Sequence, residues 1–143
     1  MNTCRLIYRS ISEERMFQSE FLSRLENQAA NNNRRLGIYG ILVASQGRFL
    51  QLLEGPSKLV NQIFIKITHD KRHHDIELIS YEEIVKPIFI DWSMRILNLD
   101  HVSSDVRTLL EKKYPLSENQ VQFPENEFLV KSFLVDIRNV LNS

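Results

Sequence analysis

The chain has 143 residues and a mass of 16.9 kDa, with eighteen basic and eighteen acidic side chains and a sequence pI near 6.9. This length suits one compact domain that buries its own core, and the balanced charge excludes the basic footprint of a nucleic-acid-binding protein. The lone Cys4 excludes an internal disulfide, and the N-terminal residues show neither a long apolar run nor a cleavage signal. We therefore expect a cytoplasmic protein that has no membrane partner.

Residues 4–10 predict the first strand, because their side chains alternate between two faces. One face carries Cys4, Leu6 and Tyr8, and the opposite face carries Arg5, Ile7 and Arg9. Tyr8 is the polar member of the first face. We therefore expect its hydroxyl to need a partner inside the protein.

A helix is predicted next, because Ser12 and the two glutamates after it form a favourable helix start. Apolar side chains then recur at helical spacing, at Phe17, Phe21, Leu22, Leu25 and Ala29. Asn32 and Asn33 continue this stripe. The buried face of the helix is therefore expected to end in two amides.

The next segments predict a hairpin of two buried strands. The strands are expected at 37–44 and 48–54, with a turn at 45–47 between them. Phe49, Gln51 and Leu53 share one face of the second strand. Gln51 is unusual there, because an amide left unpaired in an apolar interior costs roughly 1–3 kcal/mol. We expect Gln51 to bind something specific.

A second helix is predicted after Gly55 and Pro56, which supply a cap and a favoured first helical position. Its core side carries Leu59, Val60, Ile63, Phe64 and Ile67. It is expected to end at 69–74. Two further strands are predicted at 76–85 and 92–99. Trp92, Met94 and Ile96 should share a face of the last strand.

This order, β-α-β-β-α-β-β, predicts an α+β, ferredoxin-like sheet with one added strand and two helices on one face. The rest of the chain predicts two amphipathic helices with a loop at about 115–125, able to cover the second sheet face or to bind a partner. Their apolar residues are Val106, Leu109, Leu110, Tyr114, Phe128, Leu129, Phe133, Val135, Ile137 and Leu141. We assign residues 1–100 to a ligand-binding domain and 101–143 to a C-terminal helical extension.

Tyr8, Gln51 and the asparagines together predict a hydrogen-bonding pocket for a planar ligand. The pyrimidine edge of an isoalloxazine ring offers alternating acceptors and one N–H donor, which side-chain amides match. Each residue also has a plainer explanation. Tyr8 suits a core tyrosine, Gln51 suits a backbone-bonded structural amide, and Asn31-Asn32-Asn33 suits a helix C-terminus.

Five stretches within residues 4–100 form a set of motifs. They are Arg5-Leu-Ile-Tyr-Arg-Ser10, Asn32-Asn33 with Gly37-Ile-Tyr-Gly40, Phe49-Leu-Gln-Leu-Leu-Glu-Gly55, Asp70-Lys-Arg-His-His74 and Trp92-Ser-Met94. In this order and spacing they resemble the BLUF family of flavin-based blue-light sensors, and within it the short, PixD-like proteins. Two positions depart from the family pattern. Tyr39 stands where a small residue is common, and Lys71 stands where Pro is frequent.

The resemblance implies a flavin held noncovalently between the two helices, FAD in the first place, with FMN or riboflavin as alternatives. It implies Tyr8 as the light-driven donor of an electron and a proton, and Gln51 as the amide that rotates or tautomerises. Trp92 and Met94 are candidates for relaying that switch. The implied cofactor contacts are Tyr8, Leu25, Asn32, Asn33, Gln51, Lys66, Ile67, Asp70, Arg72 and His73, with Arg72 and His73 toward the ribityl phosphate.

We therefore expect a stand-alone bacterial blue-light photoreceptor that is not an enzyme and that signals in trans, because no effector domain follows residue 143. The resemblance implies a homo-oligomer with a separate response-regulator-like or other effector partner. Two alternatives remain: a flavin-dependent enzyme, which needs a substrate cavity and a proton relay, and a ligand-free ferredoxin-like interaction module. His69, His73 and His74 do not predict a metal site, because adjacent histidines cannot easily face one tetrahedral ion.

Overall fold

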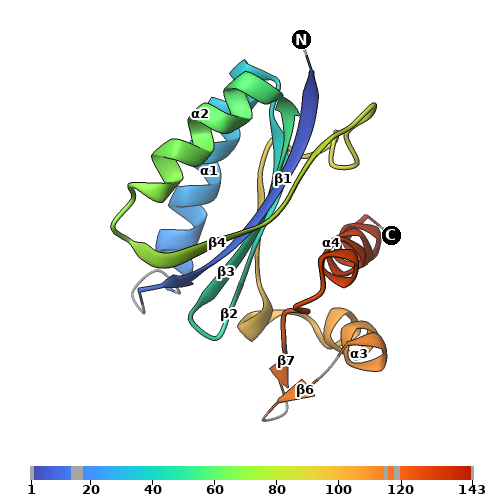
Figure 1. Cartoon of the computed structure of the whole chain (residues 1–143). Helices are drawn as coiled ribbons and strands as arrows, with labels where there is room; N and C mark the ends of the chain where they lie inside the picture. Colours follow the sequence, from blue (N-terminus) through green and yellow to red (C-terminus); the bar gives the residue numbers. More distant parts are fainter. Residues whose placement is uncertain (1, 14–17, 115, 118–119, 143) are drawn as a thin grey trace. The chain divides into compact units, whose positions relative to one another are not determined.

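The computed structural model describes residues 2–13, 18–114, 116–117 and 120–142 (Figure 1). Two compact units are present, Met1–Leu97 and Asn98–Ser143. The first unit contains the large sheet up to Leu97 and every described residue that lines the cavity discussed below.

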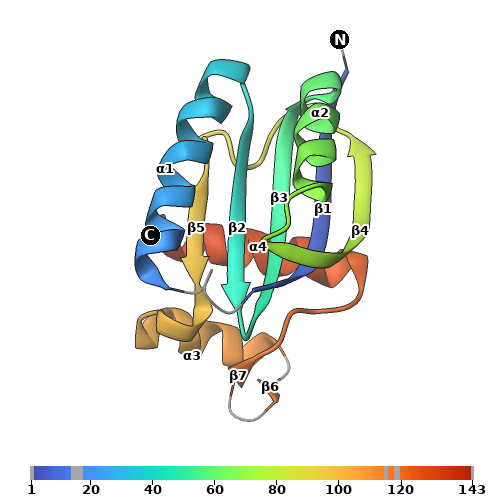
Figure 2. The same ribbon diagram turned by 90° about the vertical axis from the view of Figure 1, so that its left-hand side faces the viewer.

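The first unit follows the predicted order of elements. These are β1 (Thr3–Ser12), α1 (Ser19–Leu36), β2 (Tyr39–Ser45), β3 (Arg48–Pro56), α2 (Ser57–Thr68), β4 (His73–Glu83) and β5 (Arg95–Asn98). They form a five-stranded sheet in the order β4-β1-β3-β2-β5. Both α1 and α2 lie on one face of this sheet (Figures 1 and 2). The predicted ferredoxin-like α+β fold with two helices on one face is confirmed.

The pairing of β1, β2 and β3 sets which side chains meet. β3 pairs antiparallel with both β1 and β2, and Gln51 lies opposite Tyr8 on one side and Leu42 on the other. A two-residue turn joins β2 to β3, with φ of 53° at Gln46 and 74° at Gly47. Positive φ at both central residues defines the type I′ turn, whose twist matches that of the flanking strands.

The core of the first unit lies between the sheet and its two helices. Cys4, Leu6 and Tyr8 of β1 are buried in it, as the alternation predicts. The predicted apolar stripe of α2 also packs against this core, at Leu59, Val60, Ile63, Phe64 and Ile67. In α1, Leu22, Leu25 and Ala29 face the core, whereas the Phe21 ring packs under the guanidinium of Arg24.

Gly40 permits the close approach of β2 to β3. A Cβ atom at this position would lie 2.3 Å from the carbonyl oxygen of Leu52, so no side chain fits there. The backbone N–H of Gly40 donates to the carbonyl of Trp92 at 3.0 Å. The chain segment before β5 is thereby tied to β2.

Helix α1 begins later than predicted. Ser12 is the last residue of β1 instead of a helix start, because its backbone N–H donates to the carbonyl of Gly47 at 2.8 Å and keeps it in the sheet. Helix α1 starts at Ser19. Phe17, predicted to belong to its apolar stripe, lies outside the described residues.

The last two strands of the sheet also differ from the predicted ranges. β4 begins at His73, three residues early, because His73 pairs with Ser12 across β1. β5 is only four residues long, and the prediction of a strand from residue 92 is wrong. Trp92 and Ser93 use their backbone groups elsewhere, because the Trp92 N–H donates to Phe89 at 2.9 Å and the Ser93 carbonyl accepts from Asn33.

The second unit contains the two predicted helices. Its elements are a 3-10 turn (Leu99–His101), α3 (Ser104–Lys113), β6 (Leu116–Ser117), β7 (Gln120–Val121) and α4 (Glu127–Leu141). Strands β6 and β7 pair where only a loop was predicted. Three residues of the predicted apolar set are exposed, namely Leu109, Phe128 and Leu129.

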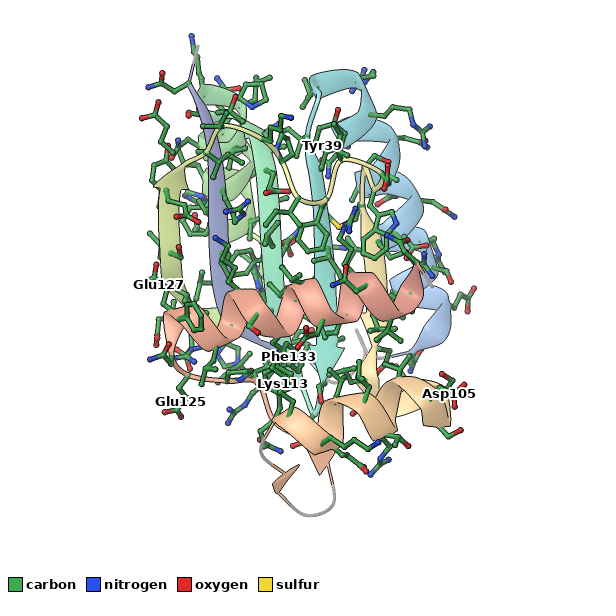
Figure 3. The ribbon with its side chains drawn as sticks, turned by 90° about the vertical axis from the view of Figure 1, so that its right-hand side faces the viewer. Tyr39, Asp105, Lys113, Glu125, Glu127 and Phe133 are labelled. Atoms are coloured by element: carbon green, nitrogen blue, oxygen red, sulfur yellow. The ribbon has the colours of Figure 1, made fainter. Side chains whose placement is uncertain are left out.

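A polar cluster joins the end of α3 to α4 in this unit. The Tyr114 hydroxyl donates to Asp136 at 2.6 Å, and the Lys113 ammonium lies 3.0 Å from the same carboxylate. The Tyr114 ring meets the Phe133 ring edge to face, with centroids 4.9 Å apart. Lys113 and Phe133 lie on the facing sides of the two helices (Figure 3).

Candidate functional site

A cavity of about 350 Å³ lies on the helix-covered face of the sheet, lined by residues of both α1 and α2. Its volume is within the usual range of small-molecule pockets. Every residue predicted to contact the cofactor lines it: Tyr8, Leu25, Asn32, Asn33, Gln51, Lys66, Ile67, Asp70, Arg72 and His73. Residues from five separate elements and one loop are thus brought to one site.

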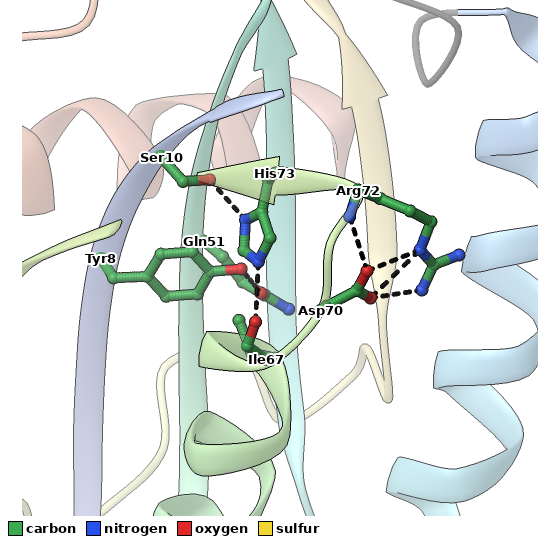
Figure 4. Close-up of polar contacts among 7 residues, drawn as sticks. All are labelled: Tyr8, Ser10, Gln51, Ile67, Asp70, Arg72 and His73. Carbon is green, nitrogen blue, oxygen red and sulfur yellow. Dashed lines mark hydrogen bonds and ion pairs between the residues drawn. The ribbon is translucent and has the colours of Figure 1, made fainter. Parts of the chain in front are cut away.

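Tyr8 and Gln51 meet at this cavity. The phenol of Tyr8 donates a hydrogen bond to Oε1 of Gln51, and both side chains are buried (Figure 4). Their pairing in the β1–β3 register explains the contact, because directly opposed residues on antiparallel strands place their side chains within reach. The Gln51 amide therefore presents its carbonyl oxygen to Tyr8.

The Tyr8 hydroxyl is held in its protonated form. Burial raises the pKa of Tyr8 well above its ordinary range, and the negative charge of Asp70 raises it further. A phenol that stays protonated remains a hydrogen-bond donor. The Tyr8 phenol therefore remains protonated at neutral pH.

His73 joins three elements beside Tyr8. Its Nε2 atom lies 2.8 Å from the Ile67 carbonyl at the end of α2, and its Nδ1 atom lies 2.7 Å from the Ser10 hydroxyl on β1 (Figure 4). A carbonyl only accepts, so Nε2 carries the proton, and in the neutral ring Nδ1 accepts from Ser10. Both ring nitrogens of His73 are thus engaged with protein groups.

Asp70 and Arg72 form an ion pair on the cavity wall after α2. Two nitrogens of the Arg72 guanidinium donate to the Asp70 carboxylate, the shortest contact being 2.6 Å, and the Arg72 backbone N–H adds a bond at 2.9 Å (Figure 4). The Arg72 side-chain hydrogen bonds hold the pKa of Asp70 below its ordinary value. The pair brings a partly exposed cation to the cavity.

The two asparagines at the end of α1 differ in burial. Asn33 is buried and its side-chain amide donates to the Ser93 carbonyl at 2.7 Å. Asn32 is exposed, and its side-chain oxygen accepts from Arg35 at 3.1 Å. Both line the cavity, whereas Asn31 is absent from the described residues that do so. Asn32 thus lies on the cavity side of α1 and Asn31 does not, as the helical spacing predicts.

The prediction that Trp92 and Met94 share a strand face is wrong, because β5 begins at Arg95. Met94 lines the cavity and belongs to the core cluster that contains Tyr8. Trp92 is not among the described residues that line it, and its ring packs against Phe89 and the Arg95 guanidinium, at 5.8 and 5.3 Å. The two side chains diverge because residues 92–94 are not a strand.

Three residues that the sequence analysis did not single out also contribute to the site. Ser10 holds His73, and Arg35 and Leu36 extend the α1 wall by one turn beyond Asn32. The spacing of three and four residues from Asn32 and Asn33 would have indicated that wall. Nothing in the local pattern around Ser10 signals its contact with His73.

The lining suits a planar aromatic ligand with one polar edge and an anionic tail. The walls are mostly apolar, from Leu25, Leu42, Phe49, Leu53, Ile63 and Ile96. Gln51, Asn32 and Asn33 offer amide donors and acceptors, and Lys66, Arg35 and Arg72 offer positive charge. This donor set fits a flavin, whose ring edge needs amides and whose phosphates need cations.

Within the described part of the chain, no cluster of three or more His, Cys, Asp and Glu side chains is arranged to hold a metal ion. No described helix has the length and apolar character needed to cross a membrane.

Residues 3–95 match the BLUF family, described as sensors of blue-light using FAD. The match spans more than half of the chain, and the chain belongs to the BLUF family. A BLUF domain binds flavin and senses blue light, which agrees with the lining of the cavity.

Relatives and solved structures agree with this membership. Photoactivated adenylate cyclase subunit alpha of Euglena gracilis is 27% identical over an alignment of 109 residues, and the match covers 74% of this chain and 11% of that protein. The photo-activated state of BlsA has a TM-score of 0.75 at 27% identity and covers 94% of each chain. BlrB, a BLUF protein in its dark state, has a TM-score of 0.73 at 25% identity, covering 98% of this chain and 97% of BlrB. The chain spans about a tenth of the length of the curated relatives it matches.

Proposed function

We propose that this protein is a blue-light photoreceptor that holds FAD noncovalently in the cavity between α1 and α2. The observation that carries the proposal is the buried hydrogen bond from Tyr8 to Gln51 at that cavity. It joins a phenol, which can release a proton, to an amide, which can exchange its donor and acceptor ends by turning. In this proposal the two side chains form a pair with two hydrogen-bonding arrangements, of which the structure contains one.

Bound flavin would supply the absorption of blue light and the capacity to accept an electron and a proton. Tyr8 gives the electron and its phenolic proton in this proposal, and takes both back when the cycle closes. Gln51 is the group that changes, because turning its amide replaces the oxygen facing Tyr8 with an NH₂ group. The rearranged amide then offers a different hydrogen bond to the ligand edge.

The other lining residues hold the ligand. Asn32 and Asn33 bind the polar edge of the ring in this proposal, and Leu25 and Ile67 contact its faces. Lys66 and Arg72 supply charge for phosphate, and Asp70 orients Arg72 through its paired hydrogen bonds. His73 shapes the wall, because its nitrogens already have protein partners in Ser10 and Ile67. FAD is favoured over FMN or riboflavin by the number of cations at the cavity.

We further propose that the protein is a sensor without catalytic activity of its own and that its output lies in a separate protein. The relatives named photoactivated adenylate cyclase carry the matching region as about a tenth of their length, which supports a sensing module that serves an effector. Self-association and a response-regulator-like partner are the forms we propose for that output. Cytoplasmic residence is part of the proposal, supported by the single buried thiol of Cys4.

An absorption spectrum of the purified protein, before and after blue light, tests the proposal. We expect bound oxidised flavin and a small red shift that reverses in the dark. Bleaching that requires an added substrate would instead indicate a flavin enzyme. A purified protein with no visible absorption, even after incubation with FAD, would contradict flavin binding and leave an interaction module.

A further inference from the structure

Glu54 is a buried carboxylate that lies outside the cavity. Its side chain has no exposed surface, and it sits on β3 three residues after Gln51. The Arg5 guanidinium on β1 donates to it through Nε at 2.8 Å and reaches it through a second nitrogen at 2.7 Å. A carboxylate in such a place is strongly disfavoured unless it is fully paired.

The remaining partners of Glu54 come from the segment between β4 and β5. The backbone N–H groups of Ile88 and Phe89 both donate to its oxygens, at 2.8 and 2.7 Å. Successive backbone N–H groups that converge on one anion form a compact binding concavity. Residues 88 and 89 are thus anchored to the sheet through Glu54.

The same segment reaches the cavity a few residues later. The carbonyl of Trp92 accepts from Gly40, and the carbonyl of Ser93 accepts from the side-chain amide of Asn33, which lines the cavity. Met94 then contributes its own side chain to the lining. The segment therefore has one end fixed by Glu54 and the other end in contact with the site.

Strand β3 carries both Glu54, which anchors the segment, and Gln51, which lines the cavity. Gln51 and Glu54 are an odd number of residues apart on one strand, so their side chains point to opposite faces of the sheet. Asn33 binds Ser93 at the cavity end of the segment, while Ile88 and Phe89 are held to β3 at the other end. A displacement of the cavity end would therefore be taken up between these points, at residues 90–94.

We propose that Glu54, held by Arg5, is a positioning residue that gives the β4–β5 segment a fixed pivot at Ile88 and Phe89, so that a change in the cavity is converted into movement of residues 90–94. This inference rests on the proposed photoreceptor function for its light-dependent part. The pivot itself is a property of the dark state.

The test compares wild type, Glu54→Gln and Glu82→Gln, each loaded with FAD. Glu54→Gln keeps the size of the side chain but replaces one acceptor oxygen with an NH₂ group. That group cannot accept the hydrogen bonds that Arg5, Ile88 and Phe89 donate to Glu54. Glu82→Gln is the matched control, because Glu82 also binds Arg5, at 2.8 Å, but its side chain is 43% exposed. The measurement is amide hydrogen exchange of residues 84–94 by NMR, in darkness and under blue light. Fluorescence of Trp92, the single tryptophan, is followed in parallel.

In the dark, we expect the Ile88 and Phe89 amides to exchange roughly tenfold to a hundredfold faster in Glu54→Gln than in wild type. Glu82→Gln should leave them unchanged. Under light, wild type should keep these two amides protected while exchange and Trp92 fluorescence change at residues 90–94. Glu54→Gln should retain the flavin red shift but lose that light-dependent difference.

Unchanged dark exchange at Ile88 and Phe89 in Glu54→Gln would overturn the pivot, whatever light does. A wild type with a red shift but no change at 90–94, or a Glu54→Gln variant that keeps the change, would overturn the relay. A wild type with bound flavin and no red shift would contradict the photoreceptor function instead. If Glu54→Gln does not fold, Ile88→Pro removes one donor to Glu54 outside the sheet. Proline has no amide proton, so the Phe89 amide alone then reports on the pivot, and its unchanged exchange would overturn it.

Discussion

Tyr8 and Gln51 are direct partners across the β1–β3 pairing, and the Tyr8 phenol donates to the Gln51 carbonyl oxygen. The strand register, and not a flexible loop, therefore sets the distance between them. Substitutions at either position should change the photochemistry without changing the backbone that carries it.

Tyr8→Phe should keep flavin, because the ring and its packing are preserved, and should abolish the reversible red shift, because the phenolic proton is absent. Leaving Gln51 without this donor should also lower the free energy of unfolding by about 1–2 kcal/mol. Absorption spectra before and after blue light provide the measurement. Tyr81→Phe is the control, because Tyr81 is 47% exposed on β4 and its hydroxyl contacts Asn61 instead. A normal red shift in Tyr8→Phe would exclude Tyr8 as the donor.

Tyr8 should also make stability depend on alkaline pH. Its pKa is raised above the ordinary value of 10.0 by burial, so the unfolded chain loses the phenolic proton before the folded protein does. The stability linked to this proton is present below pH 10 and is lost as the pH rises toward the folded pKa. Between pH 10 and 11, wild type should lose about 1 kcal/mol more unfolding free energy than Tyr8→Phe. Urea unfolding of both proteins at pH 10 and pH 11 measures this difference. Equal losses of unfolding free energy in wild type and Tyr8→Phe would contradict a raised pKa for Tyr8.

Gln51→Ala should fold and bind flavin with little or no red shift, because the amide that rearranges has been removed. Gln62→Ala, on the exposed side of α2, is the matched control and should behave as wild type. Difference spectra at saturating blue light give the answer. If Gln51→Ala shows the full shift, another group makes the new hydrogen bond.

Asn32→Ala should weaken flavin binding more than Asn31→Ala, because Asn32 lines the cavity and Asn31 is not among the described residues that line it. Losing one amide contact to a ring edge is worth about 1–2 kcal/mol, roughly a fivefold to thirtyfold change in Kd. Titration of the apoprotein with FAD measures both variants. Equal affinities would mean that Asn32 does not contact the ligand.

Met94→Ala should retain the red shift while uncoupling light from changes in assembly or partner binding, because Met94 is the cavity residue at the end of the β4–β5 segment. Light scattering and size-exclusion chromatography in darkness and light measure the response. Ile90→Ala is the control from the same segment, where Ile90 is 55% exposed. An unchanged light response in Met94→Ala would leave the segment backbone as the carrier.

The elements with strong periodicity were predictable from the sequence. The stripe of α2 and the alternation of β1 each bury a face that one pattern identifies, and Gln51 was notable because it interrupts such a pattern. The motifs also indicated which residues line the cavity. Its geometry did not, because the partnership of Tyr8 with Gln51 depends on the register between strands far apart in the chain.

Features that depend on backbone groups of distant segments could not be predicted. Residues 92–94 resemble a strand in sequence, but Gly40 and the Asn33 amide bind the carbonyls of Trp92 and Ser93. Glu54 resembles a surface carboxylate at a strand end, and only the folded chain brings Ile88 and Phe89 to it. Local propensity carries no information about such partners.

The type I′ turn at Gln46 and Gly47 has a consequence for engineering the protein. One residue inserted there would force a bulge or slide β3 by one position, and a slide would carry Gln51 to the opposite sheet face. A slide by two would keep the face but present Phe49 or Leu53 to Tyr8. The length of a turn that is not among the described residues lining the cavity can therefore affect light sensing. An insertion there that shifts β3 should abolish the red shift even where the domain still folds, whereas one that is taken up as a bulge should not.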